Sequence, residues 1–137
     1  MDELQTKAFI VLDAKFKRHV HPVAAALETK SGEIITAVGL NHFLNASCAE
    51  TAALIIAMNQ GYTDFVKVVA VTKDTDGNNT IANMCGKCRQ IFFDYSPGII
   101  VRTSGGDKSI EELLPEPFNR QHKKIQDAVK GNYESQS

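Results

Sequence analysis

Three cysteines and one glutamate are the residues of this 137-residue chain best suited to chemistry. All three cysteines lie in two short segments, 48–50 (Cys-Ala-Glu) and 85–88 (Cys-Gly-Lys-Cys). The second segment has the C-x-x-C spacing that lets two thiolates bind one metal ion. A run with helical character follows each segment, over residues 51–60 and 90–95. We therefore expect the cysteines to lie at the N-terminal ends of two helices that meet at one zinc ion.

The number of cysteines favours a catalytic metal site. A closed structural zinc site uses four protein ligands, whereas a catalytic site uses three and keeps the fourth position for water. Here Cys48, Cys85 and Cys88 supply three. Water on the metal is acidified and becomes a nucleophile near neutral pH. Glu50, two residues after the first cysteine, is the candidate that carries protons between this water and a substrate.

Other interpretations of the same residues stay open. His42 or His122 could complete a structural site of three cysteines and one histidine. Alternatively, the cysteines could be small buried hydrophobic residues without a metal. In that case Glu50, three residues after Ser47, would serve in a capping box at the start of a helix.

The charge of such a site needs compensation. Three thiolates on a divalent cation leave a net negative charge, which opposes ionisation of a bound water. The free N–H groups and positive ends of the two helices would offset this charge. Lys87 and Arg89 could offset more of it, although a solvated helix face is the commoner place for such residues.

Composition narrows the class of protein. The length is that of a single domain, expected over residues 1–137. The formal net charge of −1 gives no reason to expect a nucleic-acid partner. No apolar run approaches the roughly 20 residues that span a bilayer, and the acidic start lacks the features of a signal peptide. We therefore expect a cytoplasmic protein, in which thiols stay reduced and free to bind metal.

Hydrophobic periodicity and turn residues divide the chain into alternating strands and helices. Helices are expected at residues 3–17, 51–60, 85–95 and 120–129. Strands are expected at 23–28, 33–40, 65–72 and 99–102, with the first two forming a hairpin. The remaining segments read as loops at 41–47 and 74–80, a turn at 104–107 and a short element at 109–113. This order predicts a three-layer α/β/α sandwich with a mixed central sheet.

The cysteine segments resemble the signature of the zinc-dependent cytidine deaminases, in which Cys-Ala-Glu is followed by Cys-Gly-x-Cys-Arg-Gln. Residues 22–27 and 30–32 also resemble the family's first hairpin, and residues 112–115 with Phe118 resemble its C-terminal signature. The resemblance covers about residues 20–118. It implies the family's fold, a bound Zn²⁺, and attack of a zinc-activated water on C4 of a cytosine ring. The products would be ammonia and the uracil form of the substrate.

The resemblance also implies roles for individual residues in catalysis. Cys48, Cys85 and Cys88 would hold the zinc ion. Glu50 would carry a proton from the zinc-bound water to the ring nitrogen and then to the leaving amine.

Four further residues would bind the substrate if the resemblance holds. The backbone N–H of Ala49 would bind the carbonyl oxygen of the pyrimidine, and the backbone carbonyl of Asn83 would accept from its exocyclic amine. Asn41 would bind a sugar hydroxyl. Phe118 would reach into the pocket of a neighbouring subunit, which implies a homo-oligomer, expected to be a homotetramer.

Several positions depart from the nucleoside deaminases. Phe43 replaces a glutamate that holds the ribose, and Thr51 replaces an arginine thought to offset the thiolates. His21 replaces a pocket phenylalanine, Met84 replaces a proline, and the loop before Cys48 is shorter. The shorter loop and the changes at Phe43 and Thr51 resemble the blasticidin S deaminases. The expected substrate is therefore cytidine, deoxycytidine or another small molecule containing cytosine, with two alternatives: a blasticidin S-type deaminase, or a zinc-stabilised protein that only binds.

Overall fold

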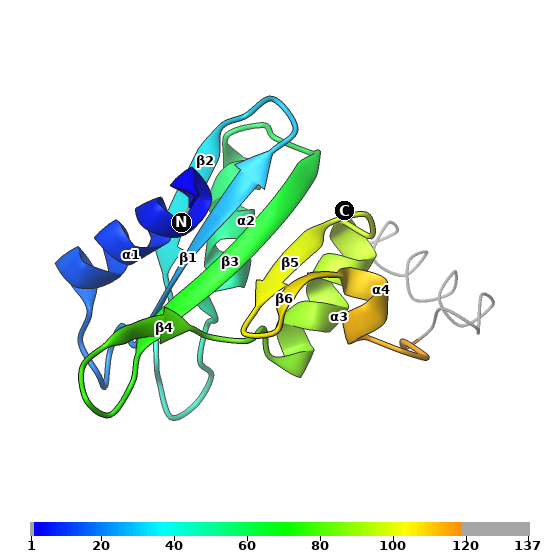
Figure 1. The fold of residues 1–137 in the computed structure, drawn as a ribbon. Helices are drawn as coiled ribbons and strands as arrows, with labels where there is room; N and C mark the ends of the chain where they lie inside the picture. The colour runs from blue at the N-terminus through cyan, green and yellow to red at the C-terminus, as the bar shows by residue number, and fades with distance from the viewer. Residues whose placement is uncertain (1, 119–137) are drawn as a thin grey trace.

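Six strands form one mixed sheet in the computed structural model, which describes residues 2–118 (Figure 1). The strands are β1 (Val23–Thr29), β2 (Ile34–Val38), β3 (Phe65–Lys73), β4 (Asn79–Ile81), β5 (Ile100–Thr103) and β6 (Gly106–Ser109). Their order across the sheet is β2-β1-β3-β5-β6, and β4 pairs with β3. Only β3 and β5 pair in parallel, so the connection between them must cross over one face of the sheet.

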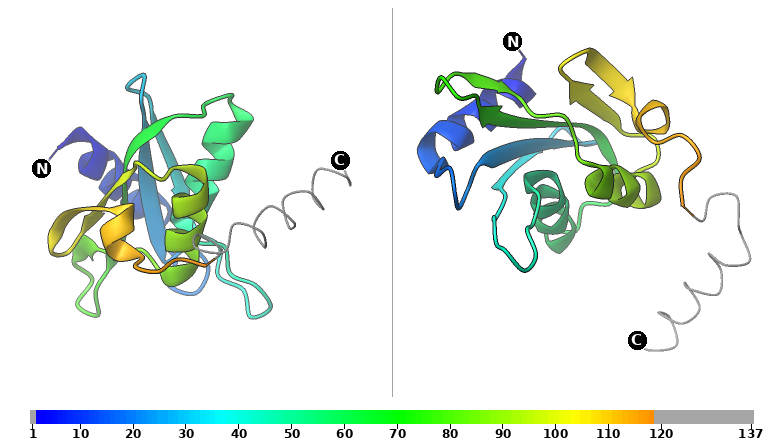
Figure 2. Two further views of the ribbon diagram at one scale, coloured as in Figure 1. Left: turned by 90° about the vertical axis from the view of Figure 1, so that its right-hand side faces the viewer. Right: turned by 90° about the horizontal axis from the view of Figure 1, so that it is seen from below.

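Helices cover both faces of this sheet (Figure 2). Helix α1 (Glu3–Lys15) lies on one face, where Leu4, Ala8 and Leu12 pack against β1 and β3. Helices α2 (Ala49–Asn59) and α3 (Gly86–Tyr95) lie on the other face, and the short helix α4 (Ile110–Leu113) packs beside α3. The three-layer α/β/α arrangement with a mixed sheet confirms the predicted fold class.

Alternation along β1 explains how two helical layers approach one sheet. Ala24 and Ala26 contact the α1 layer, whereas Ala25 and Leu27 face the opposite layer. All four side chains are fully buried. Because alanine is small, the N-terminal end of α2 comes close to the sheet, where Ala49 packs on Ala25 and Ala70 of β3.

Most of the predicted elements are confirmed. The first helix, the hairpin, the central buried strand, both cysteine helices and the strand near residue 100 are all present, with ends that differ by a few residues. The short element after residue 109 is helix α4, whose Ser109 and Glu112 form a reciprocal capping box. The polar helix predicted at 120–129 lies outside the described residues.

Three local predictions were wrong. The loop predicted at 74–80 contains the start of β4, because Asn79 and Thr80 pair with the end of β3. The turn predicted at 104–107 is shorter, since β6 begins at Gly106 and pairs with β5. Ser47 does not cap α2: the N-cap residue is Cys48, whose side chain makes no capping hydrogen bond. Glu50 therefore does not form a capping box with Ser47.

No helix within residues 2–118 is long and apolar enough to cross a membrane.

Candidate metal and catalytic site

The N-terminal ends of helices α2 and α3 lie next to each other, and each helix has a cysteine as its N-cap residue. Cys48 and Cys85 are the two N-cap residues, with nearly the same extended backbone conformation (φ −70° and ψ 148°, φ −71° and ψ 163°). Their sulfur atoms are 3.3 Å apart. Neither cysteine side chain makes a capping hydrogen bond to its own helix. The first N–H groups and the positive end of each helix therefore lie next to a cysteine, where they favour negative charge.

Backbone packing places the start of α2. Gly39, just after β2, passes so close that a Cβ atom there would lie 2.8 Å from the Ser47 carbonyl oxygen and 3.1 Å from the Ala49 nitrogen. Next to it, Leu40 and Ser47 exchange two backbone hydrogen bonds of 2.9 and 2.8 Å. The segment that carries Cys48 is therefore fixed directly against the end of the hairpin.

Polar side chains place the start of α3. The Arg89 guanidinium donates to the carbonyl of Met84 at 2.8 Å and to the carbonyl of Leu113 at 3.0 Å. The Lys87 ammonium donates to the carbonyl of Ala46 at 3.2 Å. The sequence left open whether these two cations offset thiolate charge or lie on a solvated helix face, and their described hydrogen bonds go to backbone carbonyls.

The donor set fits a zinc ion. The sulfur atoms of Cys48, Cys85 and Cys88 all lie within 4.8 Å of one another, as three ligands of one small cation must. No histidine of residues 2–118 belongs to this cluster. His42 instead accepts a hydrogen bond from the Leu44 N–H through Nδ1, and His122 lies outside the described residues. Within residues 2–118, the cluster therefore consists of three cysteines.

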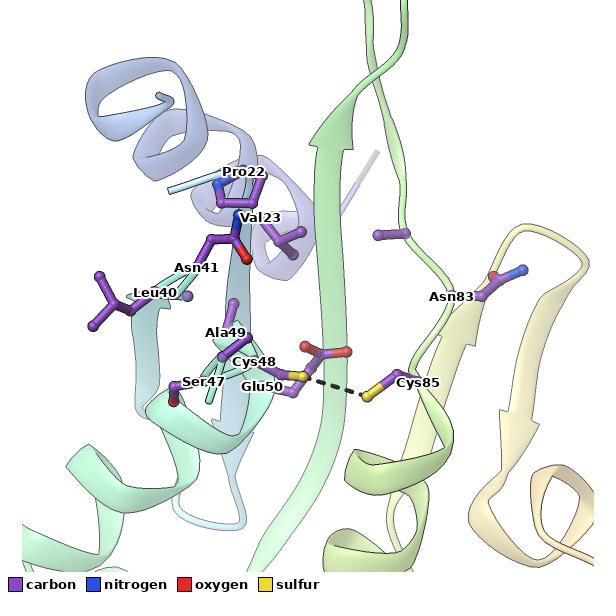
Figure 3. A pocket seen from close by; sticks show the side chains of 13 residues that line it. Pro22, Val23, Leu40, Asn41, Ser47, Cys48, Ala49, Glu50, Asn83 and Cys85 are labelled. Carbon is purple, nitrogen blue, oxygen red and sulfur yellow. Dashed lines mark hydrogen bonds between the residues drawn. The ribbon is translucent and has the colours of Figure 1, made fainter. Parts of the chain in front are cut away.

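A cavity of about 190 Å³ opens above the sulfur atoms. Its wall brings together Cys48, Ala49, Glu50 and Cys85, with Asn41 and Asn83 in the same wall (Figure 3). The Glu50 carboxylate lies beside the two labelled sulfur atoms, and the Asn83 side chain points away from them.

The predicted substrate-binding residues are thus brought together in part. The Asn83 side chain bonds to Ser104, donating to its Oγ and accepting from its N–H, so that Asn83 offers its backbone to the cavity. Phe118 is not in the cavity wall. It is 70% exposed, and its N–H donates to Gln90. Phe43 is 89% exposed on the neighbouring loop, where its ring stacks on His42 at 4.5 Å between centroids.

Burial shifts the pKa of Glu50. Its side chain is only 4% exposed, and this loss of water raises the pKa of the carboxyl group above its ordinary value. A carboxyl group with a raised pKa gives and takes a proton more easily near neutral pH. Glu50 is therefore suited to carry a proton within the cavity.

The cysteines differ in their surroundings. Burial raises the pKa of the Cys88 thiol, while a hydrogen bond with Thr51 at 3.1 Å acts in the opposite direction. Burial also opposes ionisation of Cys85, but the Cys88 N–H and the neighbouring thiols outweigh it and lower its pKa. Of the three thiols, Cys85 is therefore the one whose surroundings lower its pKa.

Sequence reasoning missed the contact between Thr51 and Cys88. Each is the third residue of its helix, and Cys48 and Cys85 are the two N-cap residues. The two pairs have the same separation of 37 positions. Once the helix starts had been aligned in the sequence, this equal spacing could have revealed the second pair. Nothing in the sequence pointed to Gly39.

Comparisons with known proteins agree with this geometry. No protein-family model matches the chain. A protein of Bacillus cereus named Blasticidin-S deaminase is 34% identical over 115 residues, which are 77% of this chain and 82% of the relative. The crystal structure of cytidine deaminase from Mycobacterium leprae superposes with a TM-score of 0.70 at 26% identity, over 82% of this chain and 95% of that one. Cytidine deaminase from Bacillus anthracis shares the fold, with a TM-score of 0.73 at 18% identity over 93% and 94% of the two chains.

Proposed function

This chain belongs to the cytidine deaminase-like family, and we propose that it is a zinc-dependent hydrolase of a small molecule that carries a cytosine ring. The reaction adds water at C4 of the ring and breaks the bond to the exocyclic amine. The products are the uracil form and ammonia. The observation that carries the proposal is one cavity that contains a buried carboxyl group beside a cluster of three thiols.

Cys48, Cys85 and Cys88 would hold the zinc ion as thiolates. Bound zinc supplies Lewis acidity, which makes a water molecule nucleophilic near neutral pH. The two helix N-termini that converge on the sulfur atoms favour the negative charge of the thiolates.

Glu50 would carry the proton through the reaction. From its buried position it would take a proton from the attacking water, give it to the ring nitrogen, and later supply one to the leaving amine. The backbone N–H of Ala49, in the first turn of α2, would bind the carbonyl oxygen of the ring. The backbone carbonyl of Asn83 would accept from the exocyclic amine, which places C4 near Glu50.

The outer end of the cavity bears on the choice of substrate. Asn41 lies in the wall and would bind a hydroxyl of the sugar. Phe43, in the position of the ribose-binding glutamate, offers no acceptor for a second hydroxyl. Together with the 34% identity to a blasticidin-S deaminase, this absence favours a second candidate, a blasticidin S-type substrate whose sugar is not ribose.

We also propose that the enzyme is a cytoplasmic homo-oligomer, expected to be a homotetramer. Phe118 is 70% exposed, and the outer face of α2 exposes Ile55, Ile56 and Met58. Apolar side chains gathered on one surface favour burial against another copy of the chain. A cytoplasmic location would keep the three thiols reduced. Light scattering of the purified protein tests the assembly, and a monomer would contradict it.

An ultraviolet assay of the zinc-loaded protein tests the proposed reaction. The substrates are cytidine, deoxycytidine, cytosine and blasticidin S, and the readout is loss of cytosine absorbance with release of ammonia. Turnover of a ribonucleoside or deoxyribonucleoside would support binding of the sugar by Asn41 without the glutamate. Turnover of blasticidin S alone would support the second candidate. No turnover of any of the four, with zinc bound, would exclude these substrates and point to an unusual cytosine derivative or to a protein that only binds.

A further inference from the structure

Thr51 contacts the most buried of the three cysteines. Its hydroxyl oxygen lies 3.1 Å from the sulfur of Cys88, which has no exposed surface. The contact joins the first turn of α2 to the first turn of α3. Thr51 itself is half-buried and does not belong to the wall of the cavity. It is therefore placed to act on a cysteine and not on a substrate.

The chemistry of a metal ligand decides the direction of this hydrogen bond. A cysteine that binds zinc does so as a thiolate, which has no proton to donate. The Thr51 hydroxyl must then donate, and the Cys88 sulfur must accept. A donor to a ligand's charged atom holds the ligand in place and lowers the cost of its buried negative charge.

The other hydrogen-bond donors near the three cysteines act on atoms other than the Cys88 sulfur. The Cys88 N–H favours the thiolate of Cys85 and lowers the pKa of that thiol. Arg89 and Lys87, the two cations that flank Cys88 in the sequence, donate to backbone carbonyls. Within residues 2–118, Thr51 is the side chain outside the cysteine cluster that is hydrogen-bonded to one of its sulfur atoms.

We propose that Thr51 is a positioning residue of the zinc site, whose hydroxyl donates to the Cys88 thiolate and slows the loss of zinc. The inference rests on the proposed function, because it requires zinc at the three cysteines.

Three variants test this role. Thr51→Val keeps the shape of the side chain and removes the hydroxyl, and Thr51→Ala removes it without branching. Thr51→Ser keeps the hydroxyl. Zinc content is measured first by atomic emission, and the transfer of zinc to a coloured chelator is then followed over time. We expect Thr51→Val and Thr51→Ala to release zinc about tenfold faster than wild type, and Thr51→Ser to stay within about twofold.

A second readout separates a hydrogen bond to sulfur from a general loss of packing. In the cobalt-substituted protein, the sulfur-to-cobalt charge-transfer band should move in Thr51→Val and Thr51→Ala and return in Thr51→Ser. Thr29→Val is the matched control, since it removes a buried hydroxyl that bonds to Ser31 and Glu33 instead of a cysteine. It should change neither the zinc transfer rate nor the band.

The outcomes distinguish this proposal from the proposed function. Wild-type protein that binds no zinc when supplied with it would contradict the zinc site itself. Zinc-loaded wild type with the same transfer rate and the same band as Thr51→Ala would overturn the role of Thr51 alone. If Thr51→Val does not fold, the pair Thr51→Ala and Thr51→Ser, which differ by one hydroxyl, decides the matter.

Discussion

Helices α2 and α3 start in the same way and serve the site differently. Each begins at a cysteine N-cap with free N–H groups. The first turn of α2 then carries the buried carboxyl group of Glu50, whereas the first turn of α3 carries a second thiol, Cys88. Helix α2 therefore supplies the proton-carrying group of the proposed mechanism, and the start of α3 supplies two of the three metal ligands.

The two helix starts are also held by different forces. The start of α2 is fixed by backbone atoms that pack against Gly39 and by small side chains on the sheet. The start of α3 is fixed by long polar side chains, above all Arg89, that donate to backbone carbonyls. Close packing tolerates no added atom, whereas a hydrogen-bonded anchor fails when its donor is removed. Different substitutions should therefore damage each helix start.

The largest effect is expected where α2 meets β2. In Gly39→Ala the new Cβ would lie 2.8 Å from the Ser47 carbonyl oxygen, so the segment carrying Cys48 and Ala49 must shift. A displacement of this kind costs about 1–3 kcal/mol of stability and about 10- to 100-fold in kcat/KM. Urea unfolding and the ammonia assay measure the two effects.

The matched control is a glycine at the start of α3. A Cβ at Gly86 meets no atom within 4 Å, and its φ is not in the left-handed region. Gly86→Ala should therefore keep wild-type stability or gain up to about 1 kcal/mol, because alanine favours a helix. Equal losses of stability and of kcat/KM in both variants would show that the starts of α2 and α3 are held by the same kind of packing.

A smaller effect is expected from the anchor of α3. Arg89→Met keeps much of the apolar stem but leaves the carbonyls of Met84 and Leu113 without these donors. The loss should be about 1–2 kcal/mol of unfolding free energy in urea. Arg18→Met is the control, because Arg18 donates to the Asp74 carbonyl at an exposed position. A change as small as that of the control would mean that Arg89 does not hold α3.

The smallest effect is expected far from both helix starts, at Asp107 of β6. Two hydrogen bonds, the more important from Arg102 and the other from Lys67, hold the pKa of Asp107 below its ordinary value of 3.8. A lowered pKa in the folded state stabilises the fold above pH 3.8, and this contribution is lost as the pH falls through the folded pKa. Because Asp107 and its ion pairs with Arg102 and Lys67 are partly exposed, Asp107→Asn should lower the free energy of unfolding by no more than about 1 kcal/mol at neutral pH.

Urea unfolding at neutral pH and at about pH 3 measures this difference. The gap between wild type and Asp107→Asn should narrow at the lower pH. Asp76→Asn, in the exposed loop before β4, is the control and should match wild type at both values. A difference in unfolding free energy that becomes larger at the lower pH would contradict a lowered pKa of Asp107 in the folded state.

Spacing and periodicity predicted the parts of this molecule that depend on local pattern. The C-x-x-C spacing placed Cys85 and Cys88 together at a helix start, and the apolar run from Phe65 predicted the strand covered on both faces. The fold class followed from the order of such elements. These features could be read because residues close in the sequence determine them.

The remaining features depend on contacts between distant residues. Strand β4 exists because Asn79 and Thr80 pair with β3, although asparagine is uncommon in strands and the segment before it is rich in Asp, Gly and Asn. Cys48 and not Ser47 is the N-cap of α2, and Ser47 instead exchanges backbone hydrogen bonds with Leu40, a residue distant from α2 in the predicted pattern. The hydrogen bond of Thr51 joins two helices, so helix propensity alone could not reveal it.

The central claim is that Glu50 moves the proton while the three cysteines hold the metal. The most direct measurement is ammonia release by Glu50→Gln beside Cys88→Ser, with the zinc content of each determined on the same sample. We expect Glu50→Gln to keep about one zinc per chain and to lose at least about 10²-fold in rate. We expect Cys88→Ser to lose both zinc and activity. Wild-type ammonia release by zinc-loaded Glu50→Gln would contradict the account.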